Sequence, residues 1–362
     1  MTARRALSLL PPCATTGIGS LPHTQLELAL QMSLQTDVPF VPQLPTGNPS
    51  ELMIPAALDG LPGLSFDEEG MCTVEVGAWE AERGTFDARI DRAISSGDLN
   101  PFEPSPQACR AWRPFLWEVQ QRKLPFAKIQ IAGPATVRWV ARTSDGLAAS
   151  DAPALDQQMF RLILAKGLAM VKAVRAAGAV PLLYLDEPGL YALDLRNPRH
   201  VVVLQELKVM AIALQREGAL VGLHCCSNTH WPSVLRLGLD IISLDVRLSL
   251  DALLEGSVDF LGHLMSGATV SLGVVPTDLA TAYEVTELAE SVEASLKATL
   301  PRPRAYPDVL AQALLTPACG LGMRSVSDAE RIFGELREAR RALLQSIQAE
   351  RGESLEPAPL SH

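Results

Sequence analysis

Aromatic and basic residues are both scarce in this chain. Phenylalanine, tryptophan and tyrosine make up 5% of the 362 residues, whereas hydrophobic residues of all kinds make up 48%. A large core is therefore expected, built mainly from leucine, valine, isoleucine and alanine. The 31 basic residues form no run and are outnumbered by 41 acidic residues, which gives a net charge of −10. This balance argues against a nucleic-acid partner.

Long apolar runs, export signals and nucleotide-binding motifs are also missing. No apolar run approaches the roughly 20 residues of a membrane span, and the apolar patch in the opening MTARRALSLLPPC is too short for a signal peptide. We therefore expect a cytoplasmic protein without a membrane partner. No GxGxxG or P-loop pattern follows a predicted strand, which argues against nucleotide binding.

Cysteine is too sparse for a secreted disulfide framework. The chain has six cysteines, which in a reducing compartment serve as core residues or metal ligands. Four of them are expected to be ordinary core residues: Cys13, Cys72, Cys109 and Cys225.

The chain does contain apolar runs of strand length, most of them followed by an amphipathic helical stretch. The runs are continuous rather than alternating, as in parallel strands buried on both faces; they cover residues 15–19, 38–43, 127–132, 180–186, 220–225, 240–245, 269–275 and 311–316. Eight such units predict an α/β fold, a single (β/α)8 TIM barrel spanning residues 1–362 as one catalytic domain. A doubly wound open sheet is the alternative.

The connection between the second and third predicted strands is too long for a simple crossover. Residues 44–126 contain their own helical patterns and a short strand-like stretch near 73–76. We interpret this segment as a helical insertion after strand two that covers the mouth of the barrel. The tail, residues 353–362, is expected to be disordered.

Metal-ligand residues stand at the ends of three predicted strands. His224 and Cys226 are two apart, so on a strand both side chains leave from the same face. Asp245 ends the next strand, and Cys319 follows the last one. The carboxyl ends of barrel strands form the active site, and two thiolates with one imidazole favour tetrahedral Zn²⁺. The alternative is that these are ordinary strand residues.

Six motifs, in order along most of the chain, resemble the catalytic barrel of cobalamin-independent methionine synthase, in the superfamily that also holds uroporphyrinogen decarboxylase. They are TGIGSLPHT (16–24), IAGPATVRW (131–139), YLDEPGL (184–190), LHCCSN (223–228), DIISLDV (240–246) and TPACGLGMR (316–324). The resemblance implies a zinc-dependent methyltransferase that moves a methyl group to the thiol of homocysteine to give methionine. It implies metal ligation by His224, Cys226 and Cys319, with Asp245 at the position of the family's glutamate.

The resemblance also implies how homocysteine is held. Its amino-acid end would be bound by the segment Ile18, Gly19 and Ser20 and by Asp186 of the Asp-Glu-Pro motif. Trp139 could stack on a flat methyl donor. The family has a histidine proposed as a proton donor after strand seven; this chain has Asp278 as the nearest candidate.

Two departures from the family concern the methyl donor. The folate-dependent enzyme has two barrels, and its glutamate-bearing stretch after strand two is replaced here by PTGNPSELM (45–53). The donor is therefore either methyltetrahydrofolate or a methylcorrinoid, with a corrinoid protein as a partner in the second case. Two other functions remain open: a metal-free lyase of the uroporphyrinogen decarboxylase type, and a non-catalytic zinc-binding barrel.

Overall fold

The computed structural model describes residues 3–278, 282–301 and 305–352. The tail for which disorder is expected, residues 353–362, lies outside the described residues.

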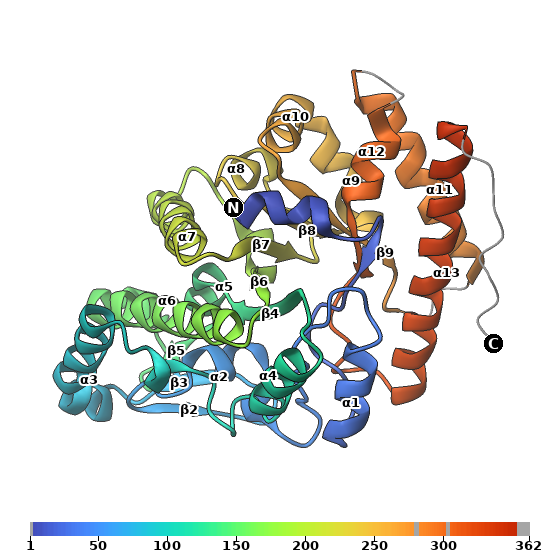
Figure 1. Cartoon of the computed structure of the whole chain (residues 1–362). Coiled ribbons are helices and arrows are strands. Elements are labelled where there is room, and N and C mark those ends of the chain that lie inside the picture. The colour runs from blue at the N-terminus through green and yellow to red at the C-terminus, as the bar shows by residue number, and fades with distance from the viewer. Residues whose placement is uncertain (1–2, 279–281, 302–304, 353–362) are drawn as a thin grey trace.

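A curled parallel sheet of seven strands forms the centre of the described molecule (Figure 1). Its order is β1-β10-β9-β8-β7-β6-β4, and every neighbouring pair is parallel. The strands are β1 (Ala14–Thr15), β4 (Phe126–Ala132), β6 (Val180–Asp186), β7 (Leu220–Cys225), β8 (Ile241–Asp245), β9 (Thr269–Val275) and β10 (Leu314–Pro317). Nearly all of their residues are buried, as the continuous apolar runs predict. The α/β class and the parallel order are confirmed.

The predicted strand at residues 38–43 is not a regular strand. It makes isolated parallel bridges, Ser20 to Gln43 and Phe40 to Lys128. Proline at positions 39 and 42 removes two backbone N–H groups, so the segment cannot complete a ladder. The segment still hydrogen-bonds to Thr15 on one side and to Lys128 of β4 on the other. Because only bridges join the two edges of the sheet, a closed eight-stranded barrel stays a prediction.

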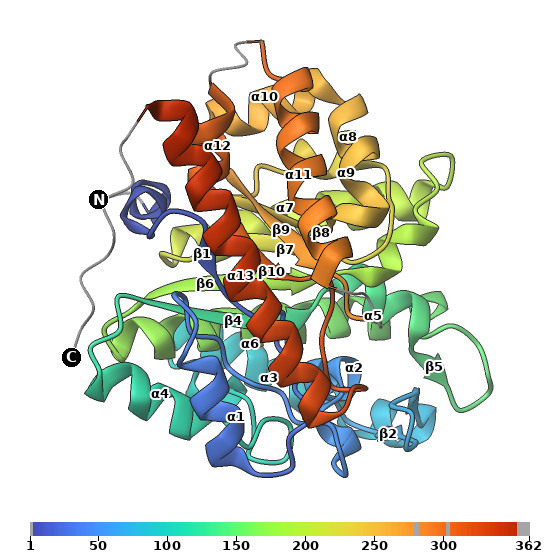
Figure 2. The same ribbon diagram turned by 90° about the vertical axis from the view of Figure 1, so that its right-hand side faces the viewer.

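Helices surround the curled sheet, and the long α13 runs across one side of it (Figure 2). Several of their N-termini carry the expected signals, such as Asn197 capping α7 with proline at the first position. They are α1 (Leu26–Ser33), α5 (Pro134–Val140), α6 (Pro153–Ala176), α7 (Pro198–Arg216), α8 (Trp231–Leu235), α9 (Val246–Glu255), α10 (Ser257–Met265), α11 (Ala282–Thr299), α12 (Tyr306–Gln312) and α13 (Val326–Arg351).

Residues 44–126, for which a helical insertion is predicted, contain several helices and also short strands. Two of its strands, together with a later one, make a small separate sheet in the order β2-β3-β5. The elements of this region are α2 (Met53–Leu58), β2 (Leu64–Phe66), β3 (Cys72–Val74), α3 (Val76–Ser96), α4 (Trp112–Gln121) and the later β5 (Arg142–Thr143). Short 3-10 helices cover Ala3–Leu9, Pro49–Glu51, Asn100–Phe102, Ala149–Asp151 and Pro188–Ala192.

The N-terminal 3-10 helix packs against the amino ends of the strands. Ala6 and Leu7 join a buried cluster whose other members include Phe126, Leu182 and Leu220, each at or near the start of a strand. This end of the sheet is therefore filled with apolar side chains. The carboxyl ends of the strands, near which the predicted metal ligands lie, are at the other end of the sheet.

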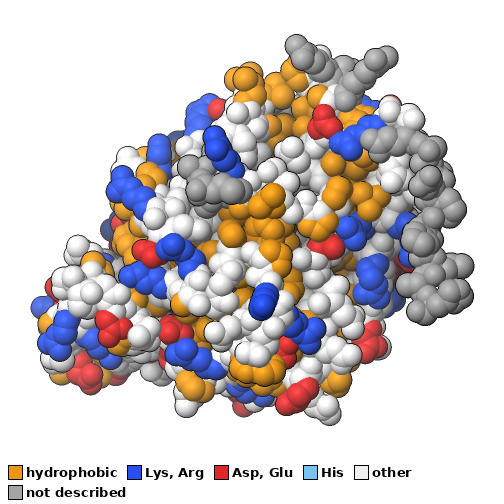
Figure 3. Space-filling view, in the orientation of Figure 1, with side chains coloured by type: hydrophobic (Ala, Val, Ile, Leu, Met, Phe, Trp, Pro, Cys, Tyr) orange, Lys and Arg blue, Asp and Glu red, His pale blue; other side chains and the backbone are white. Residues whose placement is uncertain are grey.

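The surface agrees with the charge balance of the sequence. On the face shown in Figure 3, basic and acidic side chains are interspersed, and hydrophobic side chains gather over its centre. Among the residues that the structure describes, no helix combines the length and the apolar character that crossing a bilayer requires.

Candidate metal centre and adjoining cavity

Three of the four predicted metal ligands come together. His224 lies near the end of β7, Cys226 directly follows that strand, and Cys319 follows β10. One ligand atom from each lies within 4.8 Å of the other two. Ligand atoms on one tetrahedral Zn²⁺ are about 3.5 Å apart, so small side-chain movements would bring all three to bonding distance. Two sulfurs and an imidazole nitrogen fit this ion.

The ring of His224 is held in an orientation suited to a metal. Its Nδ1 hydrogen-bonds to the hydroxyl of Ser243 on β8 over 3.0 Å, and both side chains are buried. Its Nε2 is also buried and has no hydrogen-bond partner. A buried nitrogen without a partner is costly, and a metal ion would satisfy it. Sequence reasoning missed Ser243, although its position two residues before Asp245 puts it on the same strand face.

The two cysteine sulfurs interact directly. A hydrogen bond from the Cys226 thiol lowers the pKa of Cys319 well below its usual value, and His224 lowers it further. The same hydrogen bond, together with burial, raises the pKa of Cys226. One negative sulfur is therefore favoured at this point, which suits a soft cation.

Asp245, the fourth predicted ligand, is not part of the group. Its carboxylate caps helix α9 by accepting a hydrogen bond from the backbone N–H of Arg247 over 2.9 Å. Asp245 directly precedes the helix, where an aspartate side chain satisfies free N–H groups. Burial raises its pKa. Among the described residues, the structure thus gathers three of the four predicted ligands, and ligation by Asp245 stays a prediction.

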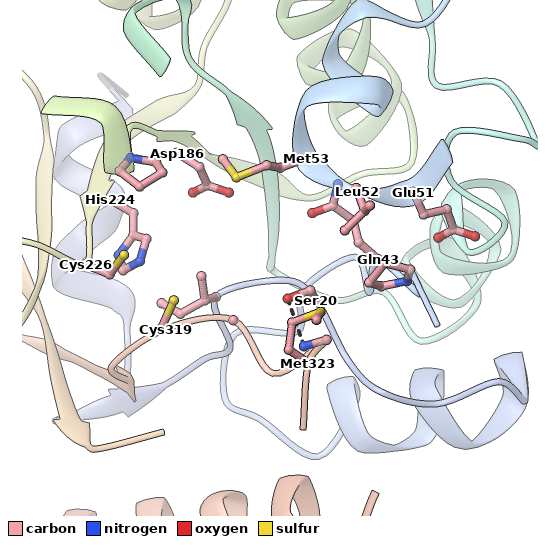
Figure 4. Close-up of a pocket in the computed structure, with 15 residues that line it drawn as sticks. Ser20, Gln43, Glu51, Leu52, Met53, Asp186, His224, Cys226, Cys319 and Met323 are labelled. Carbon is pink, nitrogen blue, oxygen red and sulfur yellow. Dashed lines mark hydrogen bonds between the residues drawn. The ribbon is translucent and has the colours of Figure 1, made fainter. Parts of the chain in front are cut away.

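A cavity of about 220 Å³ adjoins the three ligands (Figure 4). Its lining is mostly apolar, with a few polar groups, as is typical of small-molecule sites. The lining residues are Ile18, Ser20, Gln43, Pro45, Glu51, Leu52, Met53, Asp186, Pro188, His224, Cys226, Cys319, Gly320, Gly322 and Met323.

Asp186 is the charged group of the cavity that lies nearest the ligands. It ends β6, directly beside His224 in the register of the sheet, and is buried. Burial raises its pKa to about 6, whereas Lys128 and His224 oppose this shift. Its Oδ1 has no hydrogen-bond partner. A buried carboxylate oxygen without a partner is suited to a cationic group of a ligand.

The neighbouring Glu187 is occupied by the fold. It accepts hydrogen bonds from the backbone N–H groups of Ala135 and Thr136 and from the Thr136 hydroxyl, at 2.7 to 2.9 Å. Gly133 lets this carboxylate approach, because a Cβ there would lie 2.1 Å from Glu187 Oε1. Glu187 therefore fixes helix α5 against the loop that follows β6.

Of the predicted homocysteine-binding segment, Ile18 and Ser20 line the cavity. Gly19 between them does not, and its Cα faces the amide of Gln130, where a Cβ would lie 2.5 Å from Nε2. The binding roles predicted for this segment and for Asp186 stay predictions.

Trp139 and Asp278 do not line the cavity. Trp139, on α5, packs against the ring of His200 with the ring centroids 4.6 Å apart. Asp278 forms an exposed ion pair with Arg247, which lowers the pKa of the carboxyl. An ionised, paired carboxylate is a poor proton donor, so this geometry does not favour the role predicted for Asp278. The roles of both residues stay predictions.

The insertion contributes cavity residues that sequence reasoning did not identify. Glu51, Leu52 and Met53 line the wall opposite the metal ligands (Figure 4). The carboxylate of Glu51 is taken up by Arg110 Nε at 2.6 Å and by the backbone N–H of Leu44 at 2.8 Å. Glu51 therefore holds the wall in place.

No family model matches this chain, and no curated protein sequence matches it. Among solved structures, it is similar to a Listeria monocytogenes protein described as a candidate vitamin B12-independent methionine synthase, with a TM-score of 0.42 and 16% identity. The match covers 61% of this chain and 64% of the Listeria chain, which is less than two thirds of that protein.

Proposed function

We propose that this protein is a zinc-dependent methyltransferase whose acceptor is a small thiol, homocysteine, which it converts to methionine. One observation carries the proposal: His224, Cys226 and Cys319 converge within 4.8 Å beside a cavity of amino-acid size. Zinc sites with four protein ligands are structural, whereas three protein ligands and an open position are typical of catalytic sites. The separation of Asp245 from the group supports the second kind.

The metal ion would activate the thiol, and residues of the protein would hold the metal and the acceptor. A bound Zn²⁺ supplies a Lewis acid that keeps a thiol deprotonated at neutral pH. Ser243 orients the His224 ring, and Cys226 with Cys319 supplies the remaining protein ligands. Asp186 binds the ammonium group of the acceptor and thereby fixes the direction of its chain.

The methyl transfer itself is a substitution at carbon. The acceptor sulfur forms the new bond to the methyl carbon while the bond from methyl to donor breaks, and that electron pair leaves with the donor. The thiol proton is given to water beforehand, and with methyltetrahydrofolate as donor the departing nitrogen takes up a proton from water. Because the cavity is only about 220 Å³, it suits the acceptor, and the methyl group of a methylcorrinoid or methyltetrahydrofolate must reach it from outside. A corrinoid-carrying protein is the partner in the first case.

Two alternatives have less support. A lyase of the uroporphyrinogen decarboxylase type needs basic groups for several substrate carboxylates, and the described lining of the cavity includes neither lysine nor arginine. A non-catalytic zinc site needs a closed ligand shell, whereas all three ligands here line a cavity.

The test measures zinc and methyl transfer together. The purified chain is expected to contain about one zinc ion, and to form methionine from homocysteine with methylcobalamin or methyltetrahydrofolate in parallel assays. Cys319→Ala is expected to lose both zinc and activity. Cys225→Ala is the matched control, because this neighbouring thiol is buried and hydrogen-bonds to Ser227 rather than joining the group. Full activity of the metal-free protein would refute the proposal.

A further inference from the structure

A hydrogen-bond network of buried polar groups extends from the interior of the sheet to the cavity wall. The ammonium of Lys128 donates to the carbonyl of Ile18 at 2.6 Å and to Gln130 Oε1 at 3.3 Å. The Nε2 of Gln130 donates to the carbonyl of Val41 at 2.9 Å and to Gln43 Oε1 at 3.3 Å. Gln43 then lines the cavity. This series of hydrogen-bonded groups therefore begins at the Lys128 ammonium and ends at the Gln43 amide.

The buried cation fixes the direction of both amides. Lysine has donors only, so the oxygen of Gln130 must face Lys128 and its nitrogen must face away. The carbonyl of Val41 accepts only, which requires the same orientation independently. Lys128 is fully buried; burial lowers its pKa to about 8 and Asp186 opposes this shift, so it keeps its proton at neutral pH.

The consequence lies at Gln43. Because its Oε1 accepts from Gln130, its Nε2 is left as the free end of the amide. Among the contacts of the described residues, this nitrogen has no hydrogen-bond acceptor. Ser20 lies beside Gln43 across a parallel bridge and also lines the cavity. Gln43 lies across the cavity from His224 and Cys226 (Figure 4), whereas Ser20 accepts a hydrogen bond from Gly322 in the loop that follows Cys319.

We propose that Gln43 Nε2 binds the carboxylate of the acceptor and that Lys128 and Gln130 are positioning residues that hold this amide as a donor. The inference rests on the proposed function, whose acceptor carries a thiol, an ammonium and a carboxylate. The cavity offers a matching place for each: the metal ligands, Asp186 and, on the far wall, Gln43. A neutral donor that a buried cation holds in place can bind an anion without adding a positive charge to the cavity lining.

The experiment exchanges one group of Gln43. Gln43→Glu keeps an oxygen to accept from Gln130 and replaces only the NH₂ by an oxygen, giving a carboxylate that is ionised at pH 7. Two thiols are titrated calorimetrically into zinc-loaded protein and used as methyl acceptors: homocysteine and 3-aminopropane-1-thiol, which lacks the carboxylate. For homocysteine, Kd and KM are expected to rise about 10- to 100-fold, the usual effect of losing a hydrogen bond to a charged group, with kcat changed far less. For the aminothiol, both constants are expected to change less than about threefold.

A second variant keeps the test decisive if the first acts through general damage. Gln130→Met removes the amide that links Lys128 to Gln43 while filling a similar space, and it is expected to weaken homocysteine binding in the same selective way, with zinc content unchanged. Equal weakening of both thiols in Gln43→Glu, or equal binding of both by the unaltered protein, would overturn the inference. Failure of the unaltered protein to bind zinc or either thiol would instead refute the proposed function.

Discussion

The hydrogen bond between Ser243 and His224 provides a sharp test of the metal centre. It joins two buried side chains over 3.0 Å, and Ser243 Oγ is the hydrogen-bond partner of His224 Nδ1. In Ser243→Ala, Nδ1 loses this partner in a place that water does not readily enter. The ring is then free to turn, and its proton is free to move to Nε2, the nitrogen that must bind the metal.

The size of the effect follows from the burial. Leaving one buried polar group without a partner costs about 1–3 kcal/mol, which corresponds to roughly 5- to 150-fold in an equilibrium constant. Loss of a group that orients a ligand typically lowers metal affinity about 10- to 100-fold. We therefore expect Ser243→Ala to bind zinc about 10- to 100-fold more weakly while keeping the fold.

The assay is competition for zinc with a coloured chelator, together with a thermal melt of the metal-free protein. Ser271→Ala is the matched control: Ser271 is a buried serine paired with Ser243 in the sheet, and the His224 ring hydrogen-bonds to Ser243 rather than to Ser271. Zinc affinity is expected to stay within about threefold in this control. Equal affinity of the Ser243 variant and the unaltered chain would refute the reasoning.

Three further predictions concern other residues of the site. Burial raises the pKa of Asp186 to about 6, so the KM for homocysteine is expected to rise about tenfold per pH unit as the pH falls below 6, and to be flat just above it. A KM that does not rise below pH 6, or a rise that persists in Asp186→Asn, would contradict the proposed binding of the ammonium group by Asp186. Asp245→Ala is expected to lower the free energy of unfolding by about 1 kcal/mol through loss of a helix cap, while zinc content stays unchanged. Loss of zinc from this variant would instead show that Asp245 is a metal ligand. Gly133→Ala, whose Cβ would lie 2.1 Å from Glu187 Oε1, is expected to lower the free energy of unfolding by about 1–3 kcal/mol. Gly84→Ala, in open space on α3, is expected to raise it by up to about 1 kcal/mol. Urea denaturation of both variants measures these opposite changes.

The strands were predictable wherever local sequence and burial agree. Strand β6 covers the predicted residues 180–186 and β9 the predicted residues 269–275, because an uninterrupted apolar run is stable only where the strand is buried on both faces. The last predicted run began too early, since residues up to Gln312 belong to α12. The segment at 38–43 shows the limit more clearly, because its prolines allow an extended course but forbid the ladder.

The site was predictable only in part, for a physical reason. His224, Cys226 and Cys319 could be proposed because strand ends of a parallel sheet meet at one edge. For Asp245, the same reasoning could not distinguish a ligand from a helix cap, since both place a carboxylate at a strand end. Gln43 was not identified because its chemistry depends on Lys128 and Gln130, and such cross-strand partners are decided by register rather than by local sequence.

X-ray absorption at the zinc edge, with and without homocysteine, tests the central claim most directly. The account predicts a shell of two sulfurs and one nitrogen from the protein, plus one light atom that is replaced by a third sulfur when homocysteine is added. A shell that is the same in both samples, or one without the two cysteine sulfurs, would contradict it.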